Sequence, residues 1–161
     1  LATLGLEPLQ VHVPAEVDVD EDYPLVLLTG VRERTYHHSR YRDQAWARKV
    51  SPYPLIQVHP ETAAAMGLAE ADWVEVETPA TDGVCALRVS VTDQTPQGVV
   101  RTGMGWWLPE AAAPERGALD ININAAMTYD GPWDPMSGSA DTRGLPCRMV
   151  PVKREATAKA G

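Results

Sequence analysis

Positive charge is concentrated in one short stretch of an otherwise acidic chain. The segment from Leu27 to Arg42 reads LLTGVRERTYHHSRYR, and residues 32–49 hold six Lys or Arg against two acids. The whole chain has 161 residues and a formal net charge of −8. Guanidinium groups and backbone N–H groups bind phosphate oxygens, and histidines bind metals. The stretch therefore indicates a site for a compact anionic ligand, a metal site, or only a solvated loop.

The histidines argue against a metal bound directly by this chain. His37 and His38 are neighbours, and neighbouring side chains on an extended chain point to opposite faces, so we expect them not to share one ion. His12 and His59 have no acidic or cysteine companion at ligand spacing. We therefore predict no metal site within the chain itself.

A second group of polar side chains follows in a long segment that is rich in Pro, Gly and Ala. This segment contains GMGWWLPE (103–110), DININAAMT (120–128) and DPMSGSADTRGLPC (134–147). Asn122 and Asn124 carry amides, which donate and accept hydrogen bonds at once and suit a polar heterocycle. The tandem Trp106-Trp107 fits a core position equally well, so the pattern leaves its role open.

The elements that must position these groups are mostly strands. Apolar or alternating runs predict strands at 24–29, 54–59, 72–78, 84–92, 99–104 and 147–152. A hairpin turn is expected at 79–83, and a short helix at 60–67, because Pro60 suits a first helical position and Gly67 a helix end. Six short strands with a long irregular excursion predict a mostly β fold, a small closed β-barrel with short helices. Long irregular stretches inside a domain are usually functional or disordered.

Composition and charge set the remaining limits. A net charge of −8 argues against nucleic acid and anionic membranes as partners, and no apolar run approaches the roughly 20 residues of a membrane span. We expect residues 1–22, with six acids and no base, to be an acidic linker from an upstream part of a longer chain. The barrel then covers 23–152 and a frayed tail 153–161, and the compartment stays open. Cys85 and Cys147 form no CxxC pair, so buried thiols are expected.

The order and spacing of these pieces resemble one family. TGVRERTYHHSRYR is similar to a TG-x-R-x3-aromatic-x-His-Ser-x2-Arg pattern, and HPETAAAMGLAEADWVEV to a Pro-x-x-Ala-x3-Gly-x4-Asp-x-Val segment. GWWLPE, NIN, DPMSGS and RGLPC follow in the expected order. Together they resemble the C-terminal molybdopterin-dinucleotide-binding domain of the dimethyl-sulfoxide-reductase superfamily. The most similar branch contains formate dehydrogenase, thiosulfate reductase and acetylene hydratase-like proteins.

The resemblance implies a double-psi β-barrel of the aspartate-decarboxylase-like kind that binds a cofactor and carries no catalytic residue. The implied cofactor is a bis-molybdopterin guanine dinucleotide with molybdenum or tungsten, held also by the remaining domains of a parent oxidoreductase. A 4Fe–4S cluster is implied for the missing part of that parent chain. The resemblance assigns contacts with the pterin and phosphate groups to eight residues, namely Thr29, Gly30, Arg32, His38, Ser39, Arg42, Asn124 and Arg143.

Two other function classes compete with this one. The barrel is also compatible with a non-catalytic binding or recognition module, because a fold does not fix a function. A hydrolase using His38 and Ser39 is disfavoured, because sequence neighbours are badly placed as a base and nucleophile and no GxSxG motif exists. The substrate and the choice between molybdenum and tungsten stay open from sequence.

Overall fold

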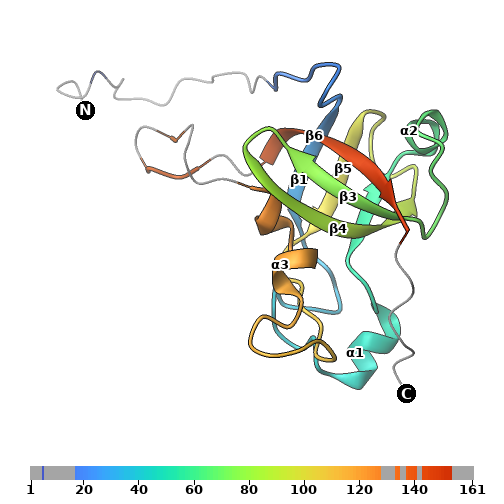
Figure 1. Cartoon of the computed structure of the whole chain (residues 1–161), viewed down its shortest axis with the longest axis vertical. Coiled ribbons are helices and arrows are strands. Elements are labelled where there is room, and N and C mark those ends of the chain that lie inside the picture. The colour runs from blue at the N-terminus through green and yellow to red at the C-terminus, as the bar shows by residue number, and fades with distance from the viewer. Residues whose placement is uncertain (1–4, 6–16, 128–132, 135–136, 141–142, 154–161) are drawn as a thin grey trace.

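Six strands close into a barrel in the computed structural model, which describes residues 5, 17–127, 133–134, 137–140 and 143–153 (Figure 1). The strands are β1 (Leu25–Val31), β2 (Leu55–Val58), β3 (Trp73–Thr78), β4 (Thr81–Val91), β5 (Val99–Gly103) and β6 (Arg143–Val152). Their order around the barrel is β1-β5-β2-β4-β3-β6, and the pairs β1–β5 and β2–β4 are parallel. The prediction of a mostly β barrel with short helices is confirmed, and the mixed topology is consistent with a double-psi barrel. Most of the predicted acidic linker and the tail from residue 154 lie outside the described residues.

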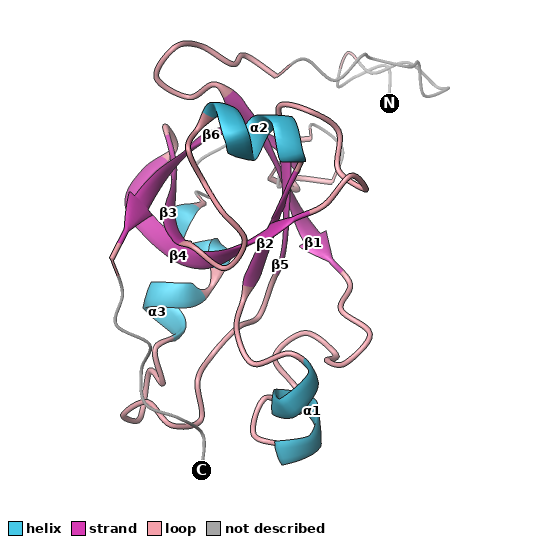
Figure 2. Ribbon diagram, turned by 90° about the vertical axis from the view of Figure 1, so that its right-hand side faces the viewer, coloured by secondary structure: helices cyan, strands magenta, loops and turns pink. Residues whose placement is uncertain are grey.

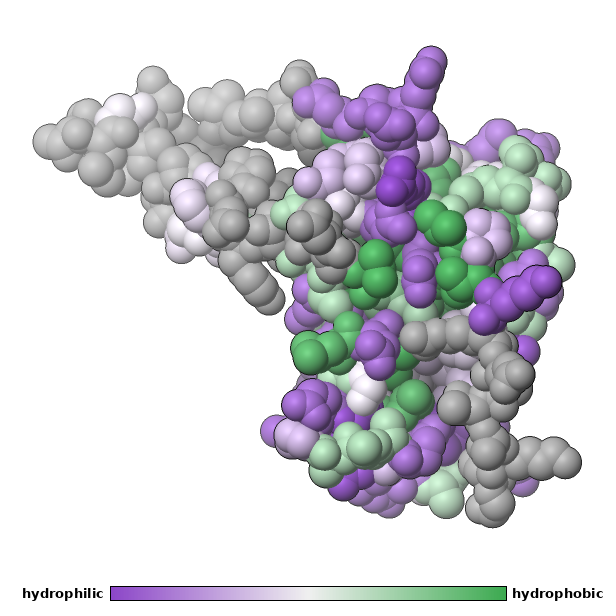
Figure 3. Space-filling view, in the orientation of Figure 1, coloured by the Kyte–Doolittle hydropathy of each residue, from purple (hydrophilic) through white to green (hydrophobic). Residues whose placement is uncertain are grey.

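The barrel core comes from the period-two alternation of the strands. In β3 every second residue is buried, and the fully buried side chains of the core include Leu27, Ile56, Val76 and Val100. Burying one such aliphatic side chain stabilises a fold by about 1.5–3 kcal/mol. The outer face of β3, β4 and β6 mixes apolar and polar residues (Figure 3), and there Arg148 Nε donates to Glu77 Oε2 at 2.6 Å. No helix among the described residues is long and apolar enough to cross a membrane.

Two strand boundaries differ from the predictions. The turn between β3 and β4 is shorter than expected, because β4 already begins at Thr81. Strand β6 begins at Arg143 instead of 147, because Leu145 and Pro146 pair with Leu27 and Val26 of β1. Proline and glycine usually weaken a strand, so the residue pattern did not indicate this first part of β6.

The short helices lie at the two ends of the barrel (Figure 2). Helix α2 (Pro60–Ala65) is the predicted one, and His59 caps it by accepting from the Glu61 backbone N–H at 3.2 Å. Helices α1 (Ala45–Val50) and α3 (Ala118–Ile121) and the 3₁₀ helix η2 (Ile123–Ala126) were not predicted. They are too short to be stable alone, so tertiary packing must hold them.

A second, smaller apolar cluster lies outside the barrel. It joins the basic stretch, α1 and the irregular excursion through the buried side chains of Tyr36, Ala47, Trp106 and Ile121. The rings of Tyr36 and Trp106 meet edge to face, with their centroids 5.4 Å apart. Segments far apart in the sequence therefore share one cluster next to the end of β1.

Cys85 and Cys147 are both buried thiols, as the sequence predicts. Burial raises the pKa of Cys147 to about 12, and only a thiolate reacts quickly. We expect the native chain to resist iodoacetamide under conditions in which the unfolded chain takes up two labels, as counted by intact mass spectrometry. Rapid labelling of the native chain, or a native mass two hydrogens too low, would contradict this prediction.

Candidate functional site

The end of β1 is shaped by a glycine that no other residue can replace without strain. Gly30 has φ +79°, and the pairing of β1 with β5 shifts register between Leu28 and Val31. A Cβ added at Gly30 would lie 3.1 Å from Met104 Cε and 3.6 Å from Nη2 of Arg143. Because β1 and β5 run parallel, their carboxyl ends bring Gly30 and Met104 together. Thr29, before this glycine, is buried within the strand.

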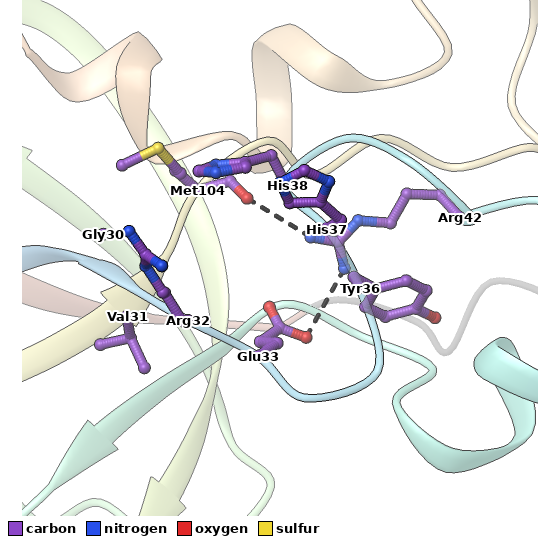
Figure 4. Close-up of a pocket in the computed structure, with 9 residues that line it drawn as sticks. All are labelled: Gly30, Val31, Arg32, Glu33, Tyr36, His37, His38, Arg42 and Met104. Atoms are coloured by element: carbon purple, nitrogen blue, oxygen red, sulfur yellow. Dashed lines mark hydrogen bonds and ion pairs between the residues drawn. The ribbon is translucent and has the colours of Figure 1, made fainter.

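A cavity of about 140 Å³ opens at this strand end (Figure 4). The residues that line it are Gly30, Val31, Arg32, Glu33, Tyr36, His37, His38, Arg42 and Met104. Four of the eight predicted contact residues are among them, namely Gly30, Arg32, His38 and Arg42. Ser39, Asn124, Arg143 and Thr29 are not part of the lining, although Arg143 lies beside Gly30.

Arg42 is buried beneath this cavity instead of lying on an exposed basic loop. Its side chain is 1% exposed, and its guanidinium carbon lies 3.8 Å from the Tyr36 ring centroid and 3.7 Å from a ring of Trp106. Nη2 donates to the Met104 carbonyl at 3.3 Å, and Nη1 lies 3.6 Å from Glu33 Oε2. Burial lowers the pKa of Arg42 and Glu33 opposes that effect, but an arginine stays charged in proteins. Within the described residues, Nε and Nη1 have no hydrogen-bond partner, so the cation keeps unused donors.

Glu33 is the functional candidate that the sequence reasoning missed. Its carboxylate is 22% exposed and accepts from Trp106 Nε1 at 2.8 Å through Oε1. In Figure 4 it lies between the Gly30–Arg32 and Tyr36–Arg42 parts of the lining. In the sequence it counted only as an acid inside a basic run. The residue pattern did not indicate that Glu33 faces Arg42, the buried arginine of the basic stretch.

Tyr36 supports the cavity from the side of the second apolar cluster. Its hydroxyl donates to the Ser51 carbonyl at 2.7 Å. Burial raises the pKa of Tyr36, and the nearby Arg48 and Arg42 oppose that rise. The phenol is therefore a neutral donor that ties the basic stretch to the segment after α1.

The turn at residues 37–40 overturns the expectation that the two histidine rings point apart. His38 has φ +54°, and the His37 carbonyl accepts from the Arg40 backbone N–H at 3.0 Å. This left-handed turn brings the rings of His37 and His38 to 5.0 Å between centroids. Nevertheless, the described residues contain no group of three or more His, Cys, Asp or Glu able to hold a metal ion.

The segment Gly105–Trp107 holds this turn in place. A Cβ on Gly105 would lie 2.8 Å from the Ser39 nitrogen and 2.9 Å from the His38 carbonyl carbon, and the residue has φ +75°. Trp107 Nε1 donates to the Ser39 carbonyl at 2.7 Å. On its other side, the Gly105 N–H donates to Asn122 Oδ1 at 3.2 Å. The tandem tryptophans and the first asparagine are thus scaffold residues of the site.

Asn122 and Asn124 have different roles in the structure. The Asn122 side chain also accepts from the Asn124 backbone N–H at 3.4 Å and so caps η2. Asn124 is exposed, and no described residue bonds its side-chain amide. Its amide is therefore available to a ligand, whereas the Asn122 amide oxygen is used within the fold.

A family model and two curated relatives match most of this chain. The family described as "Molydopterin dinucleotide binding domain" matches residues 25–146. Acetylene hydratase of Syntrophotalea acetylenica is 33% identical over 143 residues, which cover 86% of this chain and 19% of that protein. Dopamine dehydroxylase of Eggerthella lenta is 31% identical over 146 residues, covering 89% of this chain and 14% of that protein.

A solved structure supports the same comparison. The structure described as acetylene hydratase from Pelobacter acetylenicus superposes with a TM-score of 0.75 at 32% sequence identity. It covers 80% of this chain and 18% of that chain. The chain therefore spans less than a fifth of the length of these relatives.

Proposed function

The chain belongs to the molydopterin dinucleotide binding domain family of molybdenum and tungsten oxidoreductases, and on this premise we propose that its cavity holds part of a bis-molybdopterin guanine dinucleotide. The observation that carries the proposal is the cavity at the end of β1. It gathers four of the eight residues to which the resemblance assigns cofactor contacts, namely Gly30, Arg32, His38 and Arg42. The positive charge of Arg42 and the close approach allowed at Gly30 fit a polar ligand that is rich in oxygen and nitrogen.

Each proposed contact follows from where its residue lies. Gly30 lets the ligand approach the backbone, and Arg32 lies exposed on the rim, where it pairs with phosphate oxygens. His38 lines the cavity with its side chain. Four further contacts are proposed outside the lining: Thr29 and Ser39 adjoin lining residues in the sequence, Arg143 lies beside Gly30, and Asn124 presents an exposed amide. Arg42 acts from below through its charge and through its ion pair with Glu33.

We also propose that the chain acts as a lid domain of a longer enzyme. When bound, the cofactor supplies a molybdenum or tungsten centre for redox or hydration chemistry. This chain binds and orients the organic part of the cofactor and excludes water from it. The metal-ligating residue, any 4Fe–4S cluster and the substrate pocket would belong to the remaining domains, since the matched part of this chain covers only 19% and 14% of two relatives.

The proposal is tested by replacing Arg32 with alanine in the enzyme that contains this chain. We expect retention of the cofactor to fall about tenfold or more, because a hydrogen bond to a charged group contributes about 1.5–3 kcal/mol. Added salt should lower cofactor retention further, since contacts of this kind are electrostatic and partly exposed. The measurement is metal per chain, together with the fluorescence of the oxidised pterin released on denaturation.

Arg34→Ala is the matched control. Arg34 is an exposed base of the same stretch, but it does not line the cavity. It should therefore leave the pterin content unchanged. Equal pterin content in both variants and the parent would mean that the basic stretch is only a solvated face.

A further inference from the structure

The cavity contains an acid, which a site for phosphate alone would not favour. Among the described residues that line it, Glu33 is the only acid, and Arg32 and Arg42 are the arginines. The Glu33 carboxylate faces Arg42 through Oε2 and Trp106 through Oε1. A phosphate group brings negative charge and only acceptors, so this carboxylate opposes it. A ligand group that contacts Glu33 must therefore carry donors.

Acceptors and donors lie side by side in the lining. A carboxylate has about four lone-pair sites, and the structure uses Oε1 and Oε2 of Glu33 once each. Next to it, Nε and Nη1 of Arg42 are buried and lack hydrogen-bond partners within the described residues. The cavity thus presents a partly exposed, negatively charged acceptor, and the positive charge of Arg42 lies buried directly behind it.

We propose that Glu33 is a specificity-determining residue that selects the aminopyrimidinone edge of the cofactor. This inference rests on the proposed function and deepens it. Such an edge carries a ring carbonyl beside a ring N–H and an amino group. The ring N–H and the amino group donate to the Glu33 carboxylate, which Arg42 holds in place from behind. Pterin and guanine share this edge, and both belong to the proposed dinucleotide.

The cavity is large enough for the edge of one ring but not for a whole cofactor. Its volume of about 140 Å³ is well below that of pockets that enclose drug-sized ligands, roughly 300–1,000 Å³. A whole dinucleotide does not fit. The phosphate groups then lie outside the cavity, toward the exposed Arg32 on its rim.

The test uses the 161-residue chain and the indole N–H signal of Trp106 in a ¹⁵N spectrum. This proton is bonded to Glu33 Oε1, so a ligand that binds the carboxylate should shift it. The probes are 6-hydroxymethylpterin, guanosine, adenosine and inorganic pyrophosphate, and a Trp106→Phe variant assigns the signal. We expect 6-hydroxymethylpterin or guanosine to shift the signal with saturation, and adenosine to bind at least about tenfold more weakly.

Glu33→Gln should weaken binding of the responding probe at least about tenfold. Glutamine keeps an acceptor for Trp106 but loses the charge and one acceptor. Pyrophosphate should bind this variant more tightly than the parent, because the charge of Arg42 is then uncompensated. Glu77→Gln is the matched control, since Glu77 pairs with Arg148 on the outside of the barrel.

A second comparison requires no variant and therefore does not depend on folding. Lumazine has a carbonyl group in place of the amino group of pterin, so it should bind the parent chain more weakly than pterin does. Whichever of pterin or guanosine binds more tightly identifies the ring that occupies the cavity. Equal binding of lumazine and pterin, or no shift with either pterin or guanosine, would overturn the role of Glu33. A loss of cofactor in Arg32→Ala would survive that result, so the two proposals fail separately.

Discussion

Replacing Gly105 by alanine is expected to lower the free energy of unfolding by about 3 kcal/mol. A left-handed backbone costs a residue with a Cβ about 1–2 kcal/mol, and Gly105 has φ +75°. The new methyl group would also lie 2.8–2.9 Å from backbone atoms of His38 and Ser39, which cannot rotate away. Forcing such a contact costs roughly another 1–3 kcal/mol. Denaturant unfolding at constant m-value measures the loss.

Gly98→Ala separates the two causes. Gly98 has nearly the same φ, +76°, but a Cβ there would meet nothing within 4 Å. It should therefore cost only the backbone term, about 1–2 kcal/mol. Equal losses in the two variants would show that Gly105 does not pack against the 37–40 turn.

Arg42→Ala is expected to cost about 3–5 kcal/mol, the range for removing one partner of a buried ion pair. The substitution leaves Glu33 without its cation and opens a gap between the rings of Tyr36 and Trp106. Arg42→Lys should recover only part of the loss, because an ammonium group is not planar and cannot stack between two rings. Both values come from denaturant unfolding of the 161-residue chain.

Arg40→Ala is the control for this second prediction. Arg40 belongs to the same basic stretch but is exposed, so its removal should change stability by no more than about 0.5 kcal/mol. A loss of similar size for Arg40 and Arg42 would contradict the buried position of Arg42. Full recovery by Arg42→Lys would contradict the importance of stacking.

Much of the barrel could be predicted because its strands alternate. Residues 72–78 and 84–92 bury every second side chain over most of their length, and this period is visible in the sequence itself. Helix α1 could not be predicted in the same way. Gln44 precedes it without capping it, and no acid stands in its first turn. Its position depends on Ala47, which is buried in the second apolar cluster.

The position of the cavity could be predicted, but the arrangement of its side chains could not. The basic stretch indicated the strand end at which the cavity lies, and the motif order pointed to the family. The resemblance assigned Arg42 a contact with the cofactor, but the residue pattern did not indicate its burial, since arginines are rarely buried without partners. Its burial depends on Trp106, far away in the chain, and only the folded structure brings that ring to it. Residue types alone did not separate the scaffold Asn122 from the exposed Asn124, although the resemblance assigned the contact to Asn124.

The order of the strands around the barrel has a consequence for synthesis of the chain. Strand β6 lies between β1 and β3 and is the last strand described along the sequence. Until it leaves the ribosome, β1 and β3 each present an unpaired edge, and such edges promote pairing between chains. Pairing across this sequence separation is also slow. Chains cut short before residue 143 should therefore aggregate during expression, and a chaperone that shields exposed strands during translation should raise the yield of the full-length domain.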